Sequence, residues 1–105
     1  NVATFWALSD PRRLEILEHI AGGTTVTVTQ LSAALPITRQ AVARHLQTLE
    51  DAGLVMPERQ GREQRYRIDP APLDAAGRWL ATRAETWERT LQRLADYVQS
   101  EEMDS

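Results

Sequence analysis

The sequence predicts a mainly α-helical fold with one small β-hairpin, and three stretches of the chain support this prediction. Apolar residues at helical spacing run through residues 38–52, and two strand-like segments around a glycine turn follow directly. Beyond a break at Pro70 and Pro72, an apolar repeat with alternating spacings of four and three continues to Val98. The 105 residues suffice for a buried core. We therefore expect a single domain over residues 1–105.

Two short helices are expected at the start of the chain. Val2–Ser9 is apolar enough for the first, and Asp10-Pro11 provides an N-cap followed by proline at the first helical position of the second. Gly22-Gly23 should end that second helix. Its expected buried face consists of Leu14, Ile16, Leu17 and Ile20.

A third helix is expected after the β-branched run Thr24–Val28, which itself favours a short extended segment. Thr27 and Gln30 fit a capping box that would begin this helix, and Pro36 closes it. Its apolar residues are Leu31, Ala34 and Leu35. The tight gap that follows, up to Thr38, is typical of the turn in a helix-turn-helix.

The helix expected from Thr38 to about Ala52 has two chemically different faces. Thr38 is a candidate N-cap, and Gly53 stands where a left-handed C-terminal cap is expected. One face carries the apolar stripe Val42, Leu46 and Leu49, and the opposite face carries Gln40, Ala43, Arg44, Gln47 and Thr48. Gln and Arg are suited to bidentate contacts with adenine and guanine in a major groove. This pattern predicts a DNA recognition helix.

The hairpin expected after this helix has an arginine at its tip. Leu54–Arg59 and Gln64–Asp69 are the expected strands, and Gln60-Gly61-Arg62 is the expected turn. Tyr66 and Ile68 should share one face, with Arg65 and Arg67 on the other. Such a hairpin is a wing that can meet phosphates or enter a minor groove. We therefore predict a winged helix-turn-helix whose DNA-binding core covers residues 10–69.

The last helix carries a heptad seam that one small domain cannot cover. The seam lasts about 25 residues, or about 40 Å, so a two-fold dimer interface is the natural solution. We expect residues 1–9 and 70–99 to be dimerisation helices and the acidic residues 100–105 to be a frayed tail. The predicted dimerisation residues are Phe5, Leu73, Leu80, Trp87, Leu91, Leu94 and Val98.

Charge is distributed unevenly along the chain. The net charge is −3, yet six arginines face four acidic residues between Arg39 and Arg67, whereas four arginines face seven acidic residues from Ala71 onward. A local basic patch matters more for nucleic-acid binding than the sum. The lack of cysteine excludes disulfides and thiolate metal sites. With no catalytic constellation, cofactor motif or membrane-spanning run, we expect a cytoplasmic protein that is not an enzyme and needs no cofactor.

Three stretches together carry a family resemblance: DPRRLEILEHI, TQLSAALPITRQAVARHLQTLEDAGLV and RQGREQRYRID. They resemble the winged helix-turn-helix of ArsR-type bacterial transcriptional regulators. The resemblance implies a homodimer, joined by its first and last helices, that places two recognition helices in successive major grooves of an inverted repeat overlapping a promoter. It also implies recognition-helix contacts from Arg39, Gln40 and Arg44, a Thr38 hydroxyl that reaches phosphate, and a wing at the Gly61 hairpin.

The chain departs from the metal-sensing members of that family. The segment that carries paired cysteines in those members reads TVTQLSAAL here, and the last helix contains no histidine. His19 and His45 have no neighbours at ligand spacing. We therefore expect no metal site and a metal-independent regulator, possible effectors being an unknown small molecule or protein.

The predicted DNA-binding residues are Thr38, Arg39, Gln40, Arg44, His45, Arg62 and Arg65. Two of them have an ordinary alternative: His45 can pack against its neighbours, and Arg44 can be a solvated arginine. The remaining hairpin arginines, Arg59 and Arg67, can simply pair with Glu58 or Glu63. The three tryptophans, Trp6, Trp79 and Trp87, are either interface core or the lining of an effector pocket. Two other functions stay open, a protein-interaction module and a small-molecule sensor that uses the tryptophan-lined interface.

Overall fold

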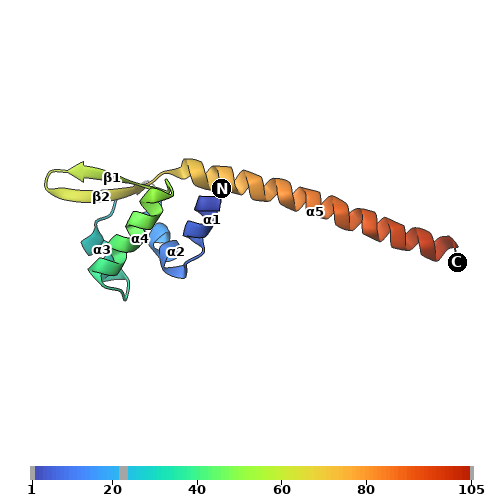
Figure 1. Cartoon of the computed structure of the whole chain (residues 1–105), viewed down its shortest axis with the longest axis horizontal. Coiled ribbons are helices and arrows are strands. Elements are labelled where there is room, and N and C mark those ends of the chain that lie inside the picture. The colour runs from blue at the N-terminus through green and yellow to red at the C-terminus, as the bar shows by residue number, and fades with distance from the viewer. Residues whose placement is uncertain (1, 22–23, 105) are drawn as a thin grey trace.

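The computed structural model describes residues 2–21 and 24–104, which form five helices and a two-stranded antiparallel hairpin (Figure 1). The elements are α1 (Val2–Leu8), α2 (Pro11–Ile20), α3 (Val28–Ala34), α4 (Arg39–Asp51), β1 (Val55–Gln60), β2 (Glu63–Ile68) and α5 (Pro70–Asp104). The first four helices and the hairpin make a compact head, from which α5 extends as a rod (Figure 1). The predicted mainly α fold with one hairpin is confirmed.

The core of the head is a single apolar cluster between α2, α3, α4 and the start of β1. Its largest fully buried side chains are Ile16, Ile20, Leu31, Val42, Leu46, Leu49, Leu54 and Val55. The prediction that Leu14 is buried is wrong, since 42% of this residue is exposed. Arg13 lies at helical spacing with Ile16, Leu17 and Ile20, so Arg13 occupies the buried stripe of α2 and Leu14 falls beside it.

The helix starts follow the side-chain capping that the sequence predicts. The backbone N–H of Gln30 donates to Thr27 Oγ1 at 3.1 Å, and the N–H of Thr27 donates to Gln30 Oε1 at 2.9 Å, which completes the capping box of α3. Thr38 Oγ1 accepts from the N–H of Ala41 at 3.1 Å and caps α4. Asp10 caps α2 by accepting from the N–H of Arg12 at 2.8 Å. The Gly22-Gly23 stop expected after α2 lies outside the described residues.

The end of α4 is a Schellman motif around Gly53, which has a φ of 75°. The N–H of Gly53 donates to the carbonyl of Glu50 and the N–H of Leu54 to the carbonyl of Leu49, both at 2.9 Å. Leu54 is fully buried just beyond the turn. The motif therefore fixes the direction in which the chain leaves α4 and enters the hairpin.

The hairpin pairs Val55 with Ile68 at its base and Gln60 with Glu63 at its tip. Gly61 and Arg62 thus form a two-residue turn, in which Gly61 has a φ of 63°. Glycine adopts a positive φ at the first residue of such a turn without strain. The strands differ from the predicted ones by one residue at each end, and Tyr66 and Ile68 pack against the core as predicted.

A third extended segment borders the hairpin. Val26 and Tyr66 exchange two backbone hydrogen bonds, of 3.1 and 2.8 Å, which confirms an extended conformation at Val26. Val28, the last residue of the expected extended segment, is instead the first residue of α3. The N–H and carbonyl of Tyr66 point toward Val26 and therefore away from β1. Pro57 lies opposite Tyr66 in β1, so the backbone nitrogen and carbonyl of Pro57 point to the open edge of the hairpin. Proline has no N–H to offer at that edge, so Pro57 blocks further strand pairing there.

A buried arginine joins α1 to α2. Arg13 Nε donates to the carbonyl of Ala7 at 2.6 Å, and its Nη2 donates to the carbonyl of Trp6 at 3.3 Å. The guanidinium also lies 5.0 Å from the centre of the Trp6 ring. Arg13 therefore gives a donor to the buried Ala7 carbonyl at the end of α1, whereas the Trp6 carbonyl also accepts from Ser9.

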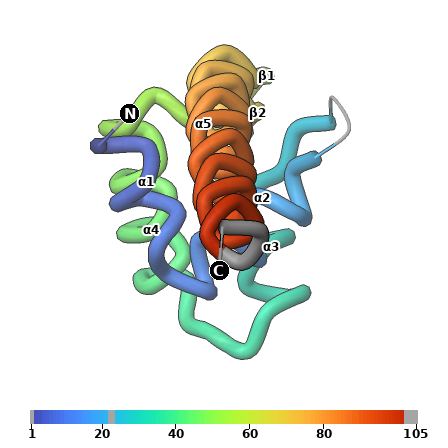
Figure 2. The backbone as a smooth tube through the Cα atoms, turned by 90° about the vertical axis from the view of Figure 1, so that its right-hand side faces the viewer, coloured from blue at the N-terminus to red at the C-terminus, as the bar shows by residue number. Residues whose placement is uncertain are grey.

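Helix α5 is attached to the head only through its first turns. Ala76 is buried, Leu73 packs against the core, and the Trp79 ring lies 5.6 Å from that of Phe5 in α1. Figure 2, a view along the rod, shows α1 close to α5 near the head. The remainder of the helix projects outward, so the radius of gyration is 20.5 Å rather than the about 13 Å of a compact domain of this length.

Helix α5 runs through most of the expected tail and continues to Asp104; fraying of residues 100–105 stays a prediction. The segment contains no proline or glycine to end the helix. A hydrogen bond from the Tyr97 hydroxyl to Glu101 Oε1 at 2.9 Å joins its last turns.

We expect Arg13→Ala to lower the free energy of unfolding by about 2–3 kcal/mol, because the substitution removes a charged hydrogen bond to the buried Ala7 carbonyl and a second one to Trp6. Urea unfolding at one fixed protein concentration measures this loss. Arg12→Ala is the matched control: Arg12 pairs with Glu15 on the surface at 3.0 Å and should cost about 0.5 kcal/mol or less. Equal losses for the two variants would contradict the linking role of Arg13.

Candidate nucleic-acid interface

Four of the five residues predicted for the polar face of α4, Gln40, Ala43, Arg44 and Gln47, are exposed, whereas Thr48 is half-buried. Thr38, Arg39, Gln40, Ala43, Arg44 and Gln47 are exposed, whereas Val42, Leu46 and Leu49 are fully buried. The small side chain of Ala43 lies between Gln40 and Arg44. The head therefore presents one helix face with amide and guanidinium donors and little steric bulk at its centre.

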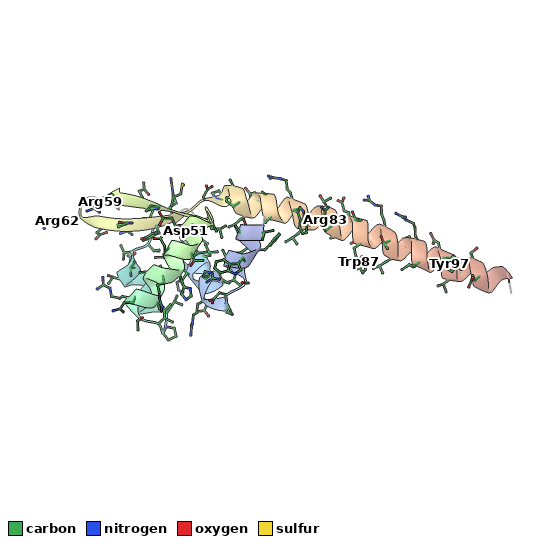
Figure 3. All side chains as sticks on the ribbon, viewed as in Figure 1. Asp51, Arg59, Arg62, Arg83, Trp87 and Tyr97 are labelled. Carbon is green, nitrogen blue, oxygen red and sulfur yellow. The ribbon has the colours of Figure 1, made fainter. Side chains whose placement is uncertain are left out.

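The far end of this face contains a contact that the sequence analysis did not use. Gln47 Nε2 donates to Asp51 Oδ1 at 2.9 Å, which orients the Gln47 amide along the helix. Asp51 lies beside the base of the hairpin (Figure 3). The spacing of four residues between a glutamine and an aspartate is the signal that could have predicted this pair.

His45 is half-buried on the flank of α4. The pKa of the nearby Asp10 carboxyl is lowered chiefly by the hydrogen bond from the Arg12 backbone, with smaller contributions from Arg13 and His45. His45 is therefore less accessible than Gln40 and Arg44 on the exposed face of α4.

The arginines of the hairpin do not share one environment. Arg59, Arg62 and Arg67 are exposed, and Figure 3 shows Arg62 at the far tip of the hairpin with Arg59 behind it. Arg65 is instead largely enclosed, with 19% of its side chain exposed. It pairs with Glu63 at 2.7 Å, so the expected pairing of a wing arginine with Glu63 involves Arg65 rather than Arg59 or Arg67.

A groove of about 630 Å³ separates the hairpin from the helix-turn-helix. One side is formed by the start of α3 and by Arg39 at the start of α4, and the other side by the tip and second strand of the hairpin. Arg39 and Arg62, from two different elements, therefore face one space. The residues that line it are Thr27, Val28, Thr29, Gln30, Arg39, Arg62, Glu63, Gln64, Arg65 and Tyr66.

The three tryptophans have separate surroundings in one protomer. Trp6 lies against Arg13, and Trp79 lies between Phe5 and Arg83, whose guanidinium carbon is 4.7 Å from the ring centre. Trp87 lies farther along the rod (Figure 3) and is 64% exposed. A shared tryptophan-lined pocket would therefore need a second chain.

The predicted dimerisation residues divide into two groups. Leu73 and Phe5 are partly buried within the protomer. The other five, Leu80, Trp87, Leu91, Leu94 and Val98, are between 50% and 64% exposed and lie along one seam of the rod. Within residues 2–21 and 24–104, no group of three His, Asp or Glu residues is placed to hold a metal ion. No helix in the same ranges is long and apolar enough to cross a membrane.

Comparison with known proteins agrees with this geometry. Residues 8–58 match the family model described as a helix-turn-helix domain. The chain is 36% identical to the HTH-type transcriptional regulator Rv2034 of Mycobacterium tuberculosis over 94% of this chain and 89% of that protein.

Two solved structures extend the similarity to three dimensions. An ArsR-like transcriptional regulator from Rhodococcus superposes with a TM-score of 0.86 at 37% identity, over 94% of this chain and 90% of that one. A homodimeric winged helix-turn-helix DNA-binding domain from Mycobacterium bovis, Mb0332, gives 0.63 at 33% identity over 77% of each chain. The chain therefore belongs to the ArsR-type family of winged helix-turn-helix transcriptional regulators.

Proposed function

We propose that the protein is a homodimeric repressor that binds an inverted-repeat operator through α4 and the hairpin wing. The observation that carries this proposal is the arrangement of α4, whose apolar stripe is buried in the core while its amide and guanidinium side chains are exposed beside the wing groove. Binding to a promoter would block transcription. A protein with this function would act in the cytoplasm, where bacterial DNA lies.

Base reading is assigned to the middle of α4. Arg44 is one helical turn from Gln40, so both side chains can reach base edges from one major groove. Ala43 between them lets the helix axis approach the bases. Gln47, oriented by Asp51 at 2.9 Å, continues the same face. His45 is half-buried and takes no part in this assignment.

Phosphate contacts are assigned to the two sides of the groove between the hairpin and the helix-turn-helix, and to Thr38 beside it. The Thr38 hydroxyl caps α4 and is exposed, so it can also donate to a phosphate oxygen. Arg39 lies at the first turn of α4 and Arg62 at the wing tip, on either side of the groove. A DNA strand that passes between the recognition helix and the wing would meet a positive charge on both sides.

The dimer is assigned to the seam of α5 together with α1. The accessible surface of one chain is 7381 Å², against about 5,900 Å² for a compact monomer of this mass. A second copy of the chain, seated on the seam, would cover much of this excess. The homodimeric state of Mb0332 supports the same assembly. Two recognition helices should then meet half-sites about 34–36 Å apart.

Arg44→Ala should flatten the preference among operator sequences, because it removes a bidentate contact worth about 1–3 kcal/mol of base discrimination. Fluorescence anisotropy with a panel of duplexes, each with one changed base pair, measures the preference. Arg89→Ala, an exposed change on the rod, is the control. If the ranking of the duplexes were the same for Arg44→Ala and the unaltered protein, Arg44 would not read bases.

Arg62→Ala should weaken binding evenly across that panel, because a phosphate contact carries no sequence information. The slope of log affinity against log salt should fall by about one for each wing on the DNA. Titrations at several salt concentrations give the slope. An unchanged slope would place the wing tip away from the phosphates.

Trp87→Ala should raise the dimer dissociation constant and leave the fold of the head intact, since Trp87 is 64% exposed in one protomer. Loss of a buried interface tryptophan costs about 3–5 kcal/mol. Sedimentation equilibrium measures the dissociation constant, with Arg89→Ala on the opposite face of α5 as control. A dimer as tight as the unaltered one would remove Trp87 from the interface.

A further inference from the structure

Arg65 differs from the other wing arginines because its guanidinium bonds to a segment 40 residues earlier in the chain. Its Nε donates to Thr25 Oγ1 at 2.7 Å, and its Nη2 donates to the Thr25 carbonyl at 3.0 Å. The Nη2 atom also lies 3.5 Å from Gln30 Oε1, the acceptor that completes the capping box of α3. The remaining nitrogen, Nη1, donates to Glu63 Oε2 at 2.7 Å.

These contacts fasten the second strand of the wing to the start of the helix-turn-helix. Thr25 directly precedes Val26, whose two hydrogen bonds to Tyr66 are the backbone link between the same two segments. The planar guanidinium spans both acceptors of Thr25 at once, a geometry that an ammonium group does not reproduce. Arg65 therefore sets how the wing stands relative to α3.

The wing groove is the space that depends on this fastening. Arg65 lines it, as do Arg39 on the α4 side and Arg62 three residues away at the wing tip. A change in the angle of the wing would move Arg62 relative to Arg39. The distance between the guanidinium groups of Arg39 and Arg62 across the groove thus depends on the contacts of Arg65.

We propose that Arg65 is a positioning residue that holds the wing at the angle needed for Arg39 and Arg62 to grip the sugar-phosphate backbone of one DNA strand. This inference rests on the proposed DNA-binding function. Arg65 acts through Arg62 rather than by contacting a phosphate, since each of its three guanidinium nitrogens already donates to Thr25 or Glu63 and its side chain is only 19% exposed.

Arg65→Lys separates positioning from charge, because lysine keeps the positive charge and loses the forked contact. A positioning role predicts that Arg65→Lys and Arg65→Gln both weaken operator binding by about tenfold, as two wings change in each dimer. Thr25→Val, which changes no charge, should weaken binding in the same direction. Arg67→Lys, at an exposed site on the same strand, should bind as the unaltered protein does. Full affinity in Arg65→Lys together with a loss in Arg65→Gln would overturn the proposal.

A double-mutant cycle with Arg62→Ala tests whether Arg65 acts through the wing tip. If it does, the double variant Arg62→Ala with Arg65→Lys should bind the operator about tenfold more weakly than the unaltered protein, as each single variant does. If the two arginines contacted phosphates independently, or if each variant merely lost folded protein, the two losses of affinity would instead multiply to about a hundredfold. The multiplied result would contradict positioning.

Amide hydrogen exchange in the DNA-free protein gives a readout that does not depend on the proposed function. The N–H of Tyr66, which donates to Val26, should exchange about tenfold faster in Arg65→Lys than in the unaltered protein. The N–H of Val42 in the core of α4 should keep its rate. Unchanged exchange at Tyr66 would overturn the positioning role, whereas absence of DNA binding by the unaltered protein would overturn only the proposed function.

Discussion

Burial of the stripe Val42, Leu46 and Leu49 is the constraint on which the rest of the head depends. These side chains belong to the same cluster as Ile16, Leu31 and Leu54, so α4 can dock on α2 and α3 in only one rotation about its axis. That rotation leaves Gln40 and Arg44 outside. The face proposed to read DNA is therefore fixed by the packing of the opposite face, and its stability is the stability of the core itself.

The same core positions the wing through short connections. The Schellman motif at Gly53 turns the chain from α4 directly into β1, whose first residue, Val55, is buried. The wing is tied to the head a second time by Val26 and Arg65. Two attachments at different points make the hairpin part of the binding surface, with a defined angle to α4 rather than a free loop.

The rod of α5 imposes a different constraint. Five large apolar side chains on one seam are half exposed or more, which is unusual for a monomer and typical of an interface that a second chain covers. The head, by contrast, builds its core from residues of one chain. The surfaces proposed for recognition and for assembly thus lie on separate parts of the chain, joined where Phe5 meets Trp79.

Local signals in the sequence predicted much of this structure. Caps at Thr27, Thr38 and Gly53 involve residues a few positions apart, and the apolar stripes have a clear period, so helices, hairpin and core followed from the chain itself. The role of Arg65 did not, because Thr25 lies 40 residues away and strand alternation alone places Arg65 with Arg67 on an exposed face. Burial of Arg13 was missed for a similar reason, since its partners are carbonyls of the preceding helix.

Helix α5 runs on through the acidic residues 100–104, because nothing in the sequence stops the helix there. The seam was recognised from its heptad spacing, but its partner lies outside a single chain. Helix caps and apolar periodicity were thus predictable, whereas the partners of individual arginines and glutamines were not.

The most direct test of the account is selection of DNA ligands for the unaltered protein from a random-sequence duplex pool, followed by affinity measurement across a salt series. The account predicts enrichment of an inverted repeat with half-sites about one helical turn apart, bound with an affinity that falls steeply as salt increases. Enrichment of no motif, or weak binding that is indifferent to salt, would contradict it and would indicate that the exposed face of α4 recognises something other than DNA.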